Sequence, residues 1–116
     1  MKNLYFLLLV FFNLNSQFLY SNQSDSLRLI WENEELTDSL RFGALDEYHD
    51  LFAHVSPEST LIALDYYHDL AILKGADRQV FRSTVRIGNI FRLQNRIEEA
   101  RAYYDEALVI AKKMNN

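Results

Sequence analysis

The side chains that could carry acid–base or metal chemistry are few in this chain of 116 residues, which has three histidines and no cysteine. No two of the histidines, His49, His54 and His68, are four residues apart, the spacing that places two imidazoles on one helix face for a metal ion. No serine or threonine has a base at a recognisable spacing, and no glycine-rich phosphate loop is present. The sequence therefore predicts no catalytic residue, no metal site and no cofactor.

One set of ionisable residues keeps an enzymatic interpretation open as an alternative. Asp46, His49 and Asp50 could converge with Arg82 or Arg86 in a pocket between helices. We see no reaction that such a set implies, and we expect a chain that is not an enzyme.

Composition narrows the class of fold and of partner. The chain has one proline and three glycines, too few for an irregular or all-β protein, so a small all-α domain is expected. Its formal net charge is −4, whereas binding to nucleic acid or to anionic lipid is driven by clustered lysine and arginine. We expect no nucleic acid partner.

The second half of the chain predicts two amphipathic helices. The first has apolar or small residues at intervals of three and four, namely Thr84, Ile87, Ile90 and Phe91. The second has a matching stripe made of Ala100, Tyr104, Ala107, Leu108 and Ala111. Gly88 lies inside the first helix, where glycine costs about 1 kcal/mol relative to alanine, and we interpret it as a site of close helix packing.

Turn residues divide these helices from each other and from what precedes them. Asn95 is predicted to cap the second helix, with Glu98 reaching back to the free amide of the cap. Gly75 is predicted to end a preceding helix in the left-handed conformation, and Asp77 to cap the next.

The preceding segment repeats this layout. Ala63, Tyr66, Tyr67 and Leu70 align with Ala100, Tyr103, Tyr104 and Ala107 at a shift of 37 residues. Leu45, Tyr48 and Phe52 align with Thr84, Ile87 and Phe91 at a shift of 39. The intervening turn has Ser56 as a cap and Pro57 at the first helical position. His49 stands opposite Gly88, which predicts looser packing in the earlier copy.

Residues 83–111 resemble one tetratricopeptide repeat. The resemblance rests on Ile87, Gly88, Phe91, Ala100, Tyr104, Ala107 and Leu108, which follow the 34-residue pattern of that family. It implies a right-handed α-α superhelix of helix hairpins, with one repeat at 37–76 and another at 77–116. It also implies a non-catalytic module that binds a protein or peptide, to which further repeats would be added.

The resemblance also implies where a peptide would bind. The first helix of each hairpin lines the concave groove in this family, and the matching positions include Asp46, Asp50, Arg82, Val85, Asn89 and Arg92. Arg82, Asn89 and Arg92 could hydrogen-bond a peptide backbone or carboxylate. The alternative is that the arginines only pair with Asp46 and Asp50 across the junction between repeats, a contribution of about 0 to 1 kcal/mol.

The first 36 residues predict a leader and a short capping segment. Lys2, the apolar run 4–12 and the polar residues that follow are typical of a signal peptide over 1–21, with an uncleaved membrane anchor as the alternative. Residues 22–36 are expected to form a short helix and a link. Trp31 would shield the first repeat, or alternatively would be an exposed anchor for a partner.

The whole layout resembles the exported front of bacterial signalling proteins whose repeats precede a membrane helix and a histidine kinase or cyclase domain. We therefore expect a periplasmic or otherwise extracytoplasmic sensing module that belongs to a longer protein. Membrane contact would come only from the leader or from a C-terminal region outside this sequence. The alternative is a free-standing secreted adaptor. If the chain belongs to a longer protein, Val109, Ile110 and Met114 would be partly exposed here, as the surface that awaits a neighbouring repeat.

Overall fold

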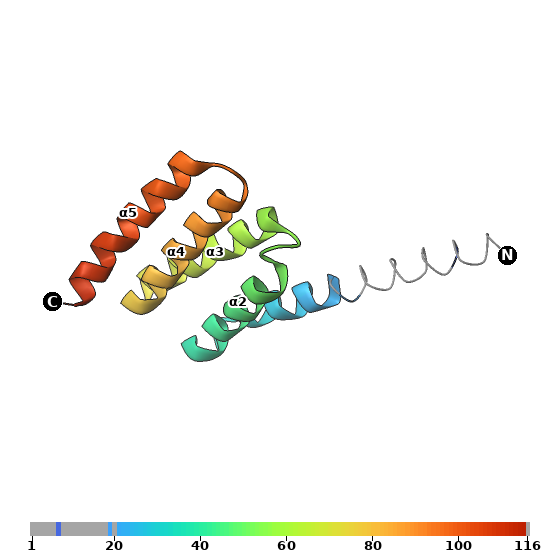
Figure 1. Ribbon diagram of the computed structural model, residues 1–116. Helices are drawn as coiled ribbons and strands as arrows, with labels where there is room; N and C mark the ends of the chain where they lie inside the picture. The colour runs from blue at the N-terminus through green and yellow to red at the C-terminus, as the bar shows by residue number, and fades with distance from the viewer. Residues whose placement is uncertain (1–6, 8–18, 20, 116) are drawn as a thin grey trace. The chain divides into compact units, whose positions relative to one another are not determined.

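The computed structural model describes residues 7, 19 and 21–115. These residues form five helices and no strand, which confirms the prediction of an all-α protein. The helices are residues 21–31, α2 (Asp38–Phe52), α3 (Pro57–Leu73), α4 (Asp77–Leu93) and α5 (Ile97–Met114) (Figure 1). The chain divides into two compact units, and the boundary between them lies within α2, between Ala44 and Leu45.

The predicted leader, residues 1–21, lies almost entirely outside the described residues. Among the helices that the structure describes, none combines the length and the apolar character needed to cross a membrane.

In the first unit, the helix over 21–31 ends at a buried tryptophan. Trp31 is buried, and its backbone oxygen accepts a hydrogen bond of 2.8 Å from Nε of Arg41. The prediction of an exposed Trp31 anchor is therefore wrong. Thr37 caps α2, because its hydroxyl oxygen accepts a bond of 3.3 Å from the backbone amide of Leu40.

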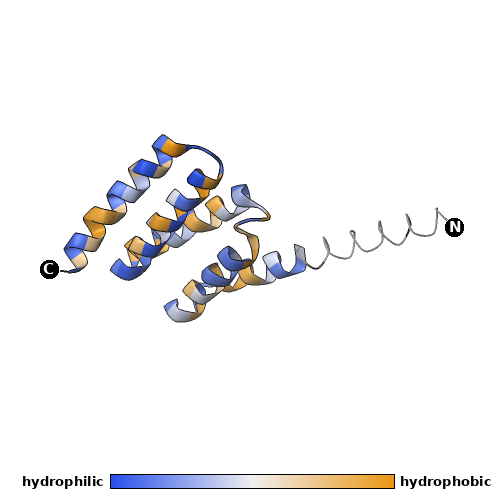
Figure 2. Ribbon diagram, viewed as in Figure 1, coloured by the Kyte–Doolittle hydropathy of each residue, from blue (hydrophilic) through white to orange (hydrophobic). Residues whose placement is uncertain are grey.

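In the second unit, α3 packs against α4, and α4 packs against α5. Apolar and polar segments alternate along α4 and α5, as expected for helices with one buried face (Figure 2). Ala53, Leu64, Ile87 and Ile90 form a buried cluster. Three partly buried side chains pack against this cluster, those of Leu61, Phe91 and Tyr103.

Hydroxyl side chains occupy several of the tightest positions in this unit. Thr60, Ser83 and Thr84 have no exposed surface. Each donates a hydrogen bond to a backbone oxygen of its own helix, over 2.9, 2.9 and 2.7 Å to Ser56, Gln79 and Val80 respectively. Because their polar atoms are satisfied within one helix, these short side chains let neighbouring helices approach closely.

The predicted stripes are confirmed at most positions: five of their residues are buried, and Phe91, Tyr104 and Ala111 are partly buried. Thr84, Ile87 and Ile90 are buried on α4, and Ala100 and Ala107 on α5. Leu108, by contrast, is 59% exposed, so its prediction as a core residue is wrong. The reason is geometric, since Leu108 lies on a side of α5 that no helix in the described part of the chain covers.

Gly88 allows α4 and α5 to approach closely, as predicted. A Cβ atom added there would lie 2.8 Å from Cε1 of Tyr104 and 3.4 Å from the backbone oxygen of Ala100. The tyrosine ring therefore occupies the space that a side chain at position 88 would need.

Two turns of three residues join the last three helices, and both close in the same way. Gly75 and Asn95 have φ angles of +62° and +61°. After α3, the amides of Gly75 and Ala76 donate to the oxygens of Ile72 and Ala71, over 3.1 and 2.9 Å. This double hydrogen bond is the Schellman motif, with a left-handed residue just past the helix end. The predicted role of Gly75 is confirmed.

The turn after α4 repeats that geometry, and it corrects the prediction for Asn95. The amides of Asn95 and Arg96 donate to the oxygens of Arg92 and Phe91, over 3.0 and 2.8 Å. Asn95 therefore ends α4 instead of capping α5, whose N-cap is Arg96. Asparagine tolerates the left-handed region better than other non-glycine residues, which explains how it can replace glycine here. The Arg96 guanidinium carbon lies 4.4 Å from the centre of the Phe91 ring.

Two other predicted caps differ in detail. Asp77 is the first residue of α4, and the N-cap is Ala76. Ser56 is the N-cap of α3, followed by Pro57 as predicted, but its side chain makes no capping hydrogen bond. The Ser56 hydroxyl instead donates to the hydroxyl of Ser59 over 2.9 Å.

The contact at Gly88 predicts opposite outcomes for alanine at two helical glycines. We expect Gly88→Ala to lower the free energy of unfolding by about 1 kcal/mol or more, because overpacking against Tyr104 outweighs the gain in helix propensity. Gly43→Ala is the matched control, because a Cβ atom there meets nothing within 4 Å. It should raise the free energy of unfolding by up to about 1 kcal/mol. Urea denaturation measures both, and equal effects would contradict the close packing at Gly88.

The left-handed conformation of Asn95 gives a second prediction. Asn95→Gly should raise the free energy of unfolding by roughly 0.5–1 kcal/mol, because glycine adopts a positive φ without steric cost. Asn95→Ala should lower it by about 1 kcal/mol. A helix N-cap would instead lose a few tenths of a kcal/mol on change to glycine, so the sign of the Asn95→Gly effect in thermal denaturation distinguishes the two roles.

Candidate functional site

The candidate site lies where the last turns of α2 face α4, within the second unit. One carboxylate of α2 is shared by two guanidinium groups of α4. Oδ1 of Asp46 accepts a hydrogen bond of 2.6 Å from Nη1 of Arg86, and Oδ2 accepts one of 3.2 Å from Nη1 of Arg82. All three side chains are partly exposed, so this cluster is accessible from solvent.

The cluster carries more positive than negative charge. Two guanidinium groups with a single carboxylate leave a net charge of +1. The buried phenol of Tyr67, on α3, lies beneath the cluster and interacts with Arg82. Burial raises the pKa of the Tyr67 hydroxyl, which therefore stays neutral near pH 7 and does not offset the excess positive charge.

A second polar group lies further along α4. The hydroxyl of Tyr104 donates a hydrogen bond of 2.6 Å to Oδ1 of Asn89 and accepts one of 3.3 Å from Nε of Arg92. The position of this tyrosine depends on Gly88, whose missing side chain leaves room for the ring. Asn89 and Arg92 are thus held in place by α5, and each keeps further donors for a ligand.

Asp50 and His49 form a separate pair on α2. Nδ1 of His49 lies 3.4 Å from Oδ1 of Asp50, and the carboxylate of Asp50 is largely exposed. Burial lowers the pKa of the imidazole, and the charge of Arg86 lowers it further, which outweighs the opposing effect of Asp50.

The structure brings some of the predicted groove residues together and separates others. Arg82 and Asp46 pair across α2 and α4, as the alternative interpretation predicted, whereas Asp50 pairs with His49. Val85 is partly buried on α4.

Two residues outside the predicted groove set belong to the site, Arg86 and Tyr104. The sequence placed Arg86 near Asp46 only in the enzymatic alternative, although it lies four residues beyond Arg82 and therefore on the same helix face. The hydroxyl of Tyr104 could not have been found from the sequence, because its partners lie 12 and 15 residues earlier, on another helix.

The described contacts of the site are hydrogen bonds and ion pairs. His49 contacts a carboxylate but no hydroxyl nucleophile among its described partners. Residues 21–115 contain no group of three or more His, Cys, Asp or Glu side chains placed to hold a metal ion. What the site offers is a row of hydrogen-bond donors along α4 with a local excess of positive charge.

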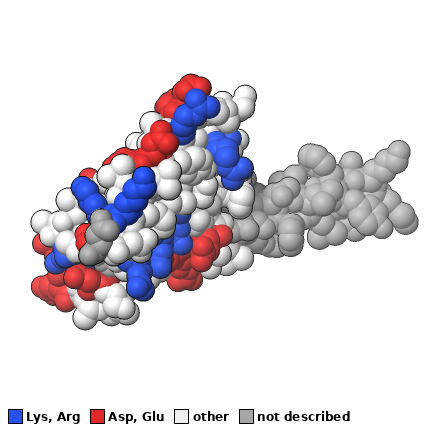
Figure 3. Space-filling model, turned by 60° about the vertical axis from the view of Figure 1, so that its left-hand side comes forward, with Lys and Arg blue, Asp and Glu red and all other residues white. Residues whose placement is uncertain are grey.

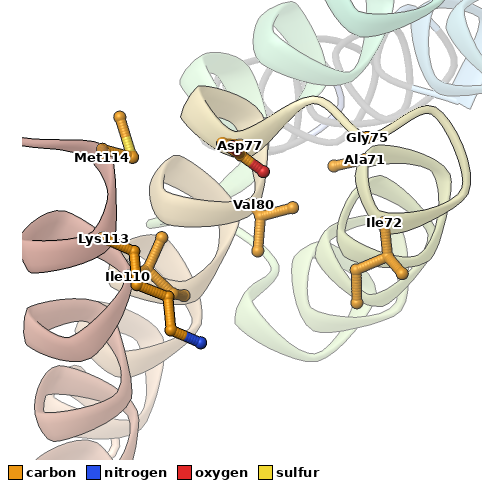
Figure 4. Close-up of a pocket in the computed structure, with 8 residues that line it drawn as sticks. All are labelled: Ala71, Ile72, Gly75, Asp77, Val80, Ile110, Lys113 and Met114. Atoms are coloured by element: carbon orange, nitrogen blue, oxygen red, sulfur yellow. The ribbon is translucent and has the colours of Figure 1, made fainter. Parts of the chain in front are cut away.

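An apolar hollow of about 280 Å³ lies elsewhere in the second unit, between the ends of α3 and α5 and the start of α4 (Figure 4). Its lining residues are Ala71, Ile72, Gly75, Asp77, Val80, Ile110, Lys113 and Met114. Only one acidic and one basic side chain border it.

Charge elsewhere is mixed. On the face drawn in Figure 3, acidic and basic groups are interspersed among uncharged ones, and neither sign forms a broad patch.

No protein-family model, curated protein or solved structure gives a significant match to this chain.

The lowered pKa of His49 predicts how stability depends on pH. The unfolded chain binds this proton near the ordinary pKa of 6.5 and the folded chain only below it, so stability is lost as pH falls below 6.5. We expect His49→Gln to lose less free energy of unfolding between about pH 7.5 and about pH 5.5 than the native chain does. His54→Gln, at an exposed position, is the control. Urea denaturation at both pH values measures the difference, and identical losses in all three proteins would contradict the assignment.

Proposed function

We propose that this chain is a non-catalytic protein-interaction module of the tetratricopeptide type, and that it binds a peptide along α4 and the end of α2. The single observation that carries the proposal is the sharing of Asp46 by Arg82 and Arg86, which leaves a partly exposed positive charge beside further donors. A peptide carboxylate, from a side chain or a C-terminus, complements that charge.

The repeated geometry of the helices supports a repeat architecture. Tyr67 on α3 and Tyr104 on α5, 37 residues apart, each direct a hydroxyl toward polar side chains of α4. The turns at 74–76 and 94–96 close with the same pair of hydrogen bonds. These features favour two hairpins, at 37–76 and 77–116, arranged as in a right-handed superhelix.

The cellular setting is proposed from the sequence. The apolar run behind Lys2 supports export, and the layout that follows it supports the extracytoplasmic sensing part of a bacterial signal-transduction protein. In that setting the module would report a bound protein or peptide to an output domain elsewhere in a longer chain.

A peptide selection tests the binding site. Peptides selected from a phage-displayed library on the immobilised chain should be enriched in Asp and Glu or in free C-termini. We expect Arg82→Ala and Arg92→Ala each to weaken the selected peptides about tenfold or more, because a hydrogen bond between charged groups contributes roughly 1.5–3 kcal/mol. Fluorescence anisotropy with labelled peptides measures the affinity.

Lys113→Ala is the control, because it removes a positive charge from the hollow on the other side of α4. If the peptides lose affinity only for Lys113→Ala, they bind in the hollow, and the proposed site is overturned. Peptides that bind every variant equally would also overturn it.

A further inference from the structure

Helix α5 carries an apolar stripe, Ile97, Tyr104 and Leu108, whose two ends stay exposed and whose middle residue, Tyr104, packs against Gly88 of α4. Ile97 and Leu108 are 47% and 59% exposed, and the partly buried Tyr104 lies between them on the same face. The residues 37 positions earlier on α3 are Thr60, Tyr67 and Ala71, and none of these has exposed surface in the unit where α3 packs against α4. The corresponding face of α3 is thus a helix-packing face, and on α5 its two ends are open.

The charges beside this stripe are ordered along the helix. Acidic residues, Glu98 and Glu99, occupy the first turn of α5, and basic residues, Lys112 and Lys113, occupy the last. Glu98, Asp105 and Lys112 recur at intervals of seven residues and follow one edge of the stripe. Arg101 is exposed on the same side and pairs with Glu98 of its own copy over 3.5 Å, a contact that Lys112 of a second copy would share. Neither lysine forms an ion pair with any residue of the described part of the chain.

This order of charges is complementary to itself when the helix is reversed. If two α5 helices pack antiparallel along their stripes, Glu98 of each copy lies beside Lys112 of the other, and the contact is made twice. The apolar residues of the two stripes meet between these pairs. Asp105 lies near the centre and meets its own copy, which is the one like-charge contact of the arrangement.

We propose that this chain forms a two-fold symmetric dimer in which a second copy packs its α5 antiparallel on α5. The helix face supplies the buried apolar surface, and the matched ends fix the direction and the register. The dimer surface is distinct from the peptide site on α2 and α4, so an experiment can contradict one proposal and leave the other standing.

Sedimentation equilibrium of the full chain tests the surface. The native chain should approach twice the 13.7 kDa of one copy, and Leu108→Asp should lower the association constant at least tenfold. Glu106→Lys is the control, because Glu106 is exposed and lies about 160° around the helix from Leu108, away from both the stripe and its charged edge. It should associate like the native chain. A native chain that stays monomeric, or association that both variants weaken equally, overturns the proposal.

A charge exchange tests the direction of packing. Glu98→Lys places like charges at both ends of the interface and should lower the association constant at least threefold, whereas Glu98→Lys combined with Lys112→Glu should restore it. The two positions are about 21 Å apart within one helix, so they cannot restore each other in a single copy. Both changes also oppose the helix dipole, so restoration cannot come from a more stable α5. A double variant no better than Glu98→Lys contradicts antiparallel pairing.

Crosslinking tests the position of the two-fold axis. The chain has no cysteine, so Asp105→Cys introduces a single thiol, which should form a covalent dimer with a short bismaleimide. Glu106→Cys, exposed on the other side of α5, should stay largely uncrosslinked. Equal crosslinking at both positions would show non-specific association and contradict the model. Asp105→Asn should tighten the dimer, because it removes the like-charge contact.

Discussion

The close approach of neighbouring helices to α4 is the constraint on which the second unit depends. Ser83, Thr84 and Gly88 are buried on this helix, and none has a side chain longer than threonine. Each buried hydroxyl is bonded to its own backbone, so it needs no partner from another helix. Without a side chain at position 88, the ring of Tyr104 lies against the α4 backbone. Its hydroxyl then reaches Asn89 and Arg92, which links the packing of the core to the polar surface.

The charged part of the site depends on the same packing. Arg82 and Arg86 are one helical turn apart on α4, so both can reach a single carboxylate on α2. The bond to Asp46 holds the guanidinium group of each arginine in one orientation. Less side-chain entropy is therefore lost when a ligand binds to them. This ordering of the donors is consistent with the proposed binding of a peptide.

Periodicity and turn residues were enough to predict the all-α class and the helices of the second unit. The spacing of Ile87, Ile90, Ala100 and Ala107 identified the buried faces, because these positions depend only on the 3.6-residue period. Gly75 and Pro57 were placed correctly, because each has a backbone preference that few positions can use. Asn95 was misassigned because asparagine is favoured both as an N-cap and in the left-handed conformation, and sequence alone does not separate the two.

The candidate site was harder to predict because it depends on contacts between helices. The pairing of Arg82 with Asp46 joins residues 36 positions apart, and spacing within one helix carries no information about it. Leu108 was placed in the core because it fits the period of α5, but burial also requires a neighbour, and periodicity cannot supply one.

The two short turns have a mechanical consequence. With only three residues between helix ends, and both ends held by paired hydrogen bonds, neither linker can lengthen under tension without losing those bonds. Any hinge movement between α3, α4 and α5 must therefore come from rotation about one backbone residue in each turn. Glycine at 75 has a wide range of φ and ψ angles, whereas asparagine at 95 has a narrow one. The turn between α3 and α4 is thus less restricted in its backbone angles than the turn between α4 and α5.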